Sequence, residues 1–144
     1  MARPTVPRNA PVPAPRVVHF ARLGLLVLAA AALAASAWWR PIDGDEGYYA
    51  AAAGLTAAGA VPYTDYFYPQ APVLPWLYAP LVKLGGPDLR LLRGFSALLA
   101  FGAVLVWSRH LSRAHRREPW VGVAALTLLV CAPGVISWSV KGKT

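Results

Sequence analysis

Uncharged apolar residues gather in three long runs that polar segments separate. The first run extends from Ala21 to Trp39, and no charged residue follows Arg22 within it. A stretch of about 20 apolar residues is enough for a helix to cross the hydrocarbon core of a bilayer. Trp38 and Trp39 stand where the aromatic belt of a membrane interface is expected. The pattern therefore predicts a membrane-spanning helix over about residues 21–39.

The second uncharged run is shorter, so a spanning helix there must include residues that flank it. Gly94–Trp107 has 14 residues, which is too few to cross a bilayer alone. If Leu89 begins the helix, Arg90 and Arg93 can bury their stems and extend their charged ends toward water. We therefore expect a second span over about residues 89–108.

The third run, Trp120–Val140, has 21 uncharged residues and is interrupted by Pro133 and Gly134. It predicts a third span over about residues 120–140. The fold class expected from the whole pattern is an all-α membrane protein with three transmembrane helices and an outer loop that bears two short interfacial helices.

The composition agrees with a membrane protein. Hydrophobic residues make up 57% of the 144 residues and charged residues only 14%, whereas a soluble domain typically has about 25% charged residues. A single cysteine, Cys131, excludes an internal disulfide framework. One alternative for the first run is a cleavable signal peptide, because Ala35-Ser36-Ala37 has the small-residue pattern of a cleavage site.

The distribution of charge predicts the orientation. Arginines precede the first run and recur in the segment 109–119, whereas the segment 40–88 holds five of the six acidic residues. By the positive-inside rule, the proline-rich tail 1–16, expected to be disordered, and the loop 109–119 are cytoplasmic. The loop 40–88 and the end 141–144 are then outside a plasma (inner) membrane. The net charge of +8 needs no nucleic acid to explain it.

The outer loop 40–88 is expected to contain two helices that lie along the membrane surface. Asp43 and Glu46 have the spacing of a capping box, and Gly59 suits the position after a helix end, which predicts a helix over 43–58. A proline-started run predicts another over 72–84.

The acidic pair Asp45-Glu46 has two interpretations. It favours the start of a helix electrostatically, or it forms a carboxylate site that takes a proton or binds a divalent cation. Tyr48 and Tyr49, beside this pair, are candidates for lining a site. The other aromatic residues of the loop are expected to be interfacial anchors.

Four segments in this order resemble the GT-C superfamily of membrane glycosyltransferases, in the branch of aminoarabinose transferases and protein O-mannosyltransferases. They are Asp45-Glu46-Gly-Tyr-Tyr-Ala, Gly59-Ala-Val-Pro-Tyr, Tyr68-Pro-Gln-Ala-Pro-Val-Leu-Pro-Trp-Leu-Tyr and Leu92-Arg-Gly-Phe-Ser. The resemblance covers about residues 20–140. It implies transfer of a sugar from a polyprenyl-phosphate carrier to an acceptor on the outer side of the membrane.

The resemblance also implies roles for individual residues. It gives Asp45, with Glu46 beside it, the place of the catalytic or metal-associated carboxylate. Arg93 and Arg90 stand where they can meet the departing phosphate; their alternative role is to anchor the helix or to pair with Asp88. Gln70 occupies a position where relatives often carry a metal-binding Glu or His, and it is assigned to substrate binding here. A neutral amide is a poorer metal ligand than Glu or His, so a divalent metal cation is implied as a cofactor only through Asp45 and Glu46.

The family has more spans than this chain, so the chain is expected to be the N-terminal part of a larger enzyme. The alternatives are a small non-enzymatic membrane protein, an inactive remnant of such an enzyme, and a transporter fragment. The last is the weakest, because no charge lies within the centre of any run. If the resemblance holds, Asp45 is functional, whereas Asp65 serves a turn.

Overall fold

The computed structural model describes residues 16–42, 44–115 and 118–132, which form five helices and no strand. The helices are α1 (Arg16–Trp39), α2 (Gly44–Ala57), α3 (Val73–Gly85), α4 (Leu89–Ala114) and α5 (Trp120–Val130). The expected all-helical fold is confirmed for this part of the chain.

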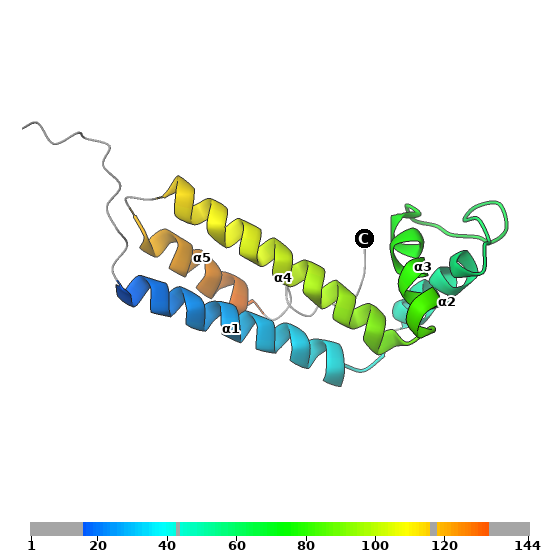
Figure 1. The fold of residues 1–144 in the computed structure, drawn as a ribbon, viewed down its shortest axis with the longest axis horizontal. Helices are drawn as coiled ribbons and strands as arrows, with labels where there is room; N and C mark the ends of the chain where they lie inside the picture. Colours follow the sequence, from blue (N-terminus) through cyan, green and yellow to red (C-terminus); the bar gives the residue numbers. More distant parts are fainter. Residues whose placement is uncertain (1–15, 43, 116–117, 133–144) are drawn as a thin grey trace, which may run out of the picture.

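Three of the helices lie side by side and the other two sit at one end of them (Figure 1). α1, α4 and α5 contact one another along the long axis of the molecule, and α4 runs antiparallel to α1. α2 and α3 pack together where α1 ends and α4 begins. The segment predicted to be the outer loop therefore forms a small helical unit on the end of the bundle.

Two helices, α1 and α4, are long and apolar enough to cross a membrane. At 1.5 Å per residue, their 24 and 26 residues extend about 36 and 39 Å. Only 17% of the apolar stretch of α1 and 22% of that of α4 are buried within the protein. Because most of this apolar surface faces outward, these helices differ from the core helices of a soluble domain.

The prediction of a third spanning helix is wrong for the part of the chain that the structure describes. α5 has 11 residues and is about 16 Å long, half of what a bilayer requires. The helix ends at Val130, shortly before Pro133, since proline lacks the backbone N–H and disfavours helical geometry in the residue before it. Residues 133–140 of the predicted span, and the end 141–144, lie outside the described residues.

The boundaries at the other end of the bundle also differ from the prediction. α4 continues to Ala114, so most of the expected loop 109–119 is helical. Arginine, leucine and alanine are strong helix formers, and the charges that end an apolar run do not end a helix. Arg16 begins α1, and residues 1–15 of the predicted tail lie outside the described residues.

Both helices expected in the outer loop are present, within one residue of their predicted ends. α2 ends before Gly59, whose φ of +101° is a conformation that glycine adopts without strain. Asp43, the predicted cap, lies outside the described residues. α3 continues through Pro80, so the prolines of this segment shape the start of the helix without breaking it.

The outer-loop unit has a core of its own, whose buried members include Tyr49, Ala53, Tyr68, Leu74 and Tyr78. Leu92 of α4 joins this core and connects the unit to the bundle. Phe95 packs against the edge of the Tyr78 ring, at 6.3 Å between centroids. The end of the bundle is thereby held in a fixed relation to α2 and α3.

Candidate functional site

A buried ion pair joins α2 to α4 where the outer-loop unit meets the bundle. The Arg93 Nη2 atom donates to Glu46 Oε2 at 2.5 Å. Both residues are almost inaccessible, with relative exposures of 6% for Arg93 and 5% for Glu46. Hydrogen bonds between ionised partners are stronger than those between neutral groups. In a buried pair, the loss of one partner is strongly destabilising, because it leaves the other charge without compensation.

The same guanidinium also holds the end of α1. Its Nη1 and Nη2 atoms donate to the carbonyl oxygens of Arg40 and Pro41, at 2.8 and 3.0 Å. Arg40 and Pro41 follow Trp39, the last residue of α1, so Arg93 fixes the chain where it leaves this helix. We call the contacts of Arg93 with Glu46, Arg40 and Pro41 the Arg93 clamp. It ties three segments of the chain at one point.

The first turn of α4 places a second arginine nearby. Asp88 caps the helix: its Oδ1 atom accepts from the Arg90 backbone N–H at 2.8 Å. The Arg90 guanidinium lies over the Trp38 ring, 4.7 Å from its centroid, which is a cation–π arrangement. Arg40 Nη1 lies 4.0 Å from Glu46 Oε1. Among the described residues, neither Arg90 nor Arg93 forms an ion pair with Asp88, the alternative considered for these arginines.

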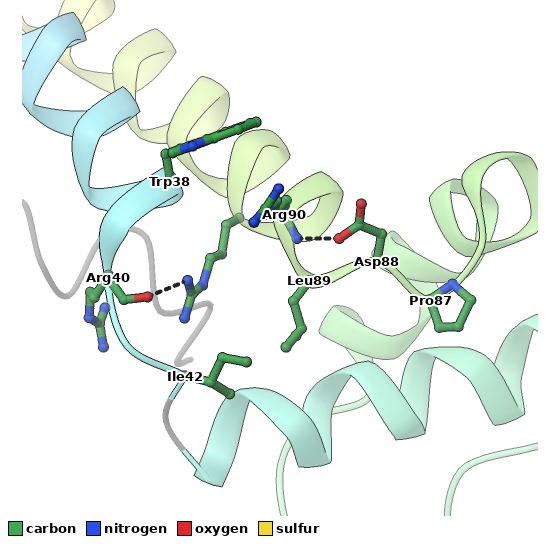
Figure 2. A pocket seen from close by; sticks show the side chains of 8 residues that line it. Trp38, Arg40, Ile42, Pro87, Asp88, Leu89 and Arg90 are labelled. Atoms are coloured by element: carbon green, nitrogen blue, oxygen red, sulfur yellow. Dashed lines mark hydrogen bonds between the residues drawn. The ribbon is translucent and has the colours of Figure 1, made fainter.

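A pocket of about 370 Å³ opens between the end of α1 and the start of α4 (Figure 2). Its lining includes Trp38, Arg40, Ile42, Asp88, Arg90 and Arg93. Three cations and one carboxylate therefore face this space, so its lining is basic. The pocket lies where α1 and α4 leave their apolar stretches, which is the depth of the lipid headgroups if these helices cross a bilayer.

The acidic pair is divided between two environments. Glu46 is buried in the Arg93 clamp, whereas Asp45 is exposed on the first turn of α2. Consecutive residues point about 100° apart around a helix, so the two carboxylates do not converge on one point. Within residues 16–42, 44–115 and 118–132, no three His, Cys, Asp or Glu side chains are grouped so that they could hold a metal ion.

The predicted substrate residues Tyr48, Tyr49 and Gln70 contact one another within the outer-loop unit and do not line the pocket. Tyr48 donates to the Phe67 carbonyl at 2.8 Å and stacks on Tyr68, with 5.8 Å between the ring centroids. Gln70 Nε2 donates to the Tyr49 hydroxyl at 2.9 Å. These residues therefore belong to a packed tyrosine cluster.

Tyr68 is the most deeply buried member of that cluster, with a relative exposure of 1%. Burial, together with the neighbouring tyrosines Tyr49 and Tyr48, raises the pKa of Tyr68 to about 12. Its hydroxyl has no hydrogen-bond partner among the described residues. The fold thus favours the neutral phenol at this position.

Sequence reasoning identified Arg90 and Arg93 but did not join them to Trp38 and Arg40. The two pairs are some 50 residues apart in the chain, and only the antiparallel packing of α1 and α4 brings them together. The sequence contained one signal for this contact. Trp38 and Arg40 lie at the outer end of the first apolar run, and Asp88 and Arg90 lie at the outer end of the second. Comparison with protein families, with curated proteins and with solved structures finds no match to this chain.

Proposed function

We propose that this chain is an integral membrane protein in which α1 and α4 cross the bilayer. Their length and outward-facing apolar surface support this placement. The bias of arginine toward one end of the pair supports an orientation with the Arg16 end in the cytoplasm and residues 40–88 outside a plasma (inner) membrane. α2 and α3 then lie on the outer surface.

The function that the geometry supports best is glycosyl transfer, with a polyprenyl-phosphate-linked sugar as the donor. The basic pocket carries this proposal, because Arg40 and Arg90 line it beside Arg93, whose charge Glu46 balances. If α1 and α4 cross the bilayer, this lining is at the depth of a lipid phosphate. Its volume of about 370 Å³ is within the range of small-molecule sites. The resemblance of the four sequence segments to GT-C enzymes supports the same substrate class.

In this proposal the acceptor hydroxyl oxygen attacks the anomeric carbon of the sugar. The bond between that carbon and the phosphate oxygen breaks, and the phosphate keeps the electron pair. Arg90 and Arg40 face the developing charge on the phosphate. Asp45, exposed at the start of α2, takes the proton of the acceptor. Glu46 is assigned a positioning role, because it holds Arg93 and does not line the pocket.

The test compares two exposed carboxylates of the same loop. Asp45→Asn keeps the shape of the side chain but removes its basicity, so we expect the rate of transfer to fall about 10²-fold or more. Asp65→Asn is the matched control, because Asp65 accepts from the Val61 N–H at 2.7 Å and serves a turn. The measurement is sugar transfer from a polyprenyl-phosphate donor in membranes that contain each variant, in the longest natural form of the chain.

Near-normal transfer by Asp45→Asn at equal protein levels would remove the catalytic role of this residue. An absence of transfer by the unaltered protein with every polyprenyl-phosphate donor would favour the alternative, a non-enzymatic membrane protein.

A further inference from the structure

The end of the bundle opposite the pocket contains a polar contact within the helix pair. Arg22 of α1 extends its Nη2 atom to Ser108 of α4, donating to the hydroxyl at 2.8 Å and to the carbonyl at 3.2 Å. Ser108 has a relative exposure of 1%, and its carbonyl also accepts from the Ser112 hydroxyl at 2.7 Å. Arg22 therefore holds α1 against α4 through neutral groups.

No carboxylate pairs with Arg22 in the part of the chain that the structure describes. Both ion pairs found there involve Glu46, at the other end of the molecule. The Arg22 Nε atom is buried and, among the described residues, has no hydrogen-bond partner. A partly buried cation is costly without an opposite charge. The charge of Arg22 is therefore not balanced by any described residue.

The spacing of the polar contacts places Arg22 near the lipid phosphates. From Arg22 to Trp38 the rise of α1 is about 24 Å, and from Arg93 to Ser108 the rise of α4 is about 22 Å. The hydrocarbon core of a bilayer is about 30 Å thick. With the pocket at the outer headgroups, Arg22 and Ser108 lie near the inner edge of the core, close to the headgroups of that leaflet.

Other basic residues lie on neighbouring turns of the two helices. Arg109 and Arg113 are exposed one turn apart on α4, and Arg16 and His19 are exposed on the turns of α1 that precede Arg22. Glu118 is the one acidic residue described at this end, and no ion pair joins it to Arg22. The local field therefore attracts anions, and in a membrane the nearest abundant anions are headgroups.

We propose that Arg22, with Arg109 and Arg113, binds the phosphate of an anionic phospholipid in the leaflet opposite the pocket. Ser108 holds the Arg22 side chain in place, and the lipid phosphate supplies the charge that the described residues do not. This site depends on the proposed placement of α1 and α4 across the bilayer but not on the proposed transferase activity.

The experiment uses the full chain in nanodiscs made of phosphatidylcholine alone or with added phosphatidylglycerol. We expect phosphatidylglycerol to raise the Tm of the protein, and we expect Arg22→Gln to lose most of this increase. Arg22→Lys keeps the cation and should retain more of it. Lys83→Gln, which removes an exposed cation outside the pocket lining, is the matched control and should keep the increase in full.

A second measurement covers the case in which Arg22→Gln fails to fold. Arg113 is exposed, so Arg113→Gln leaves the packing intact, and native mass spectrometry should then show fewer retained phosphatidylglycerol molecules than for the unaltered chain. Equal increases in Tm for Arg22→Gln and the unaltered chain would overturn the proposal. So would an equal increase from inorganic phosphate in phosphatidylcholine nanodiscs, because the site would then bind free anions. The transfer assay for Asp45→Asn is unaffected by either result.

Discussion

The two ends of the α1–α4 pair each hold an arginine at the contact between the helices, and the two arginines are satisfied differently. Arg93 has a carboxylate partner, Glu46, and two backbone carbonyls, and it is buried. Arg22 has one serine, whose carbonyl and hydroxyl are both neutral acceptors. The charge of Arg93 is therefore balanced within the protein, whereas the charge of Arg22 is not balanced by any described residue.

The difference follows from where the acidic residues lie in the sequence. The loop 40–88 contains five of the six acids, so the end of the bundle that this loop covers can supply an internal partner for its arginine. The opposite end is rich in arginine and depends on its surroundings. We therefore expect the stability of the clamp end to depend on substitutions within the protein, and the stability of the Arg22 end to depend on the lipid composition of the membrane.

The largest expected effect is on stability at the clamp end. Arg93→Met leaves the Glu46 carboxylate buried without its guanidinium and removes the contacts to the end of α1. We expect a loss of about 3–5 kcal/mol in the free energy of unfolding, measured by denaturant titration in micelles.

Two controls separate the ion pair from simple truncation. Arg90→Met removes an exposed guanidinium and should cost no more than about 1 kcal/mol. The double variant Arg93→Met/Glu46→Leu removes both charges and should recover a large part of the loss, because neither partner is left alone. If the double variant is less stable than Arg93→Met, the clamp is not organised around the ion pair.

A smaller effect is expected at the other end. Ser108→Ala removes the hydroxyl that accepts from Arg22 at 2.8 Å but leaves the carbonyl contact. Because the donor is charged, we expect a loss of about 1.5–3 kcal/mol in micelles of neutral detergent. Thr127→Ala, whose exposed hydroxyl bonds only to a carbonyl of its own helix, is the control and should change little. An unchanged stability of Ser108→Ala would show that the bond from Arg22 to the Ser108 hydroxyl does not stabilise the helix pair.

The smallest effect concerns pH and the tyrosine cluster of the outer-loop unit. The pKa of Tyr68 is raised to about 12 from an ordinary value of 10.0, so the fold favours the protonated phenol. This contribution to stability is fully present below pH 10 and is lost as the pH rises from 10 toward 12. Burial also raises the pKa of Tyr78, so titration of tyrosinate absorbance should show more than one late-titrating group, and Tyr68→Phe should remove one of them. Loss of a group that titrates near pH 10 instead would show that Tyr68 is exposed to solvent.

Much of the fold could be predicted from the sequence, because its strongest signals are local. The apolar runs predicted α1 and α4, and the positions of Gly59 and of the prolines predicted α2 and α3 to within one residue. The third span could not be judged from apolar composition alone, since Pro133 limits a helix irrespective of how apolar its neighbours are. Likewise, the arginines after Trp107 marked the end of an apolar run but not the end of α4.

The candidate site was less accessible to prediction, because it is made by contacts between distant segments. Glu46 and Asp45 are adjacent in sequence, and their adjacency predicts a pair. In the helix their side chains point in different directions, and Glu46 forms its ion pair with Arg93. Arg93 was expected to meet a phosphate, and the structure places it both in the pocket lining and in the clamp. Trp38 and Arg40 join the pocket only through the packing of α1 on α4.

The most direct test of the central claim is whether the basic pocket binds a lipid phosphate. The full chain is incubated in micelles with undecaprenyl phosphate or with undecaprenol, which has the same hydrocarbon chain but no phosphate, and bound lipid is measured by native mass spectrometry. We expect retention of the phosphate form alone, and we expect Arg90→Gln to weaken it while Lys83→Gln, outside the pocket lining, does not. Equal retention of undecaprenol, or undiminished retention by Arg90→Gln, would contradict the account.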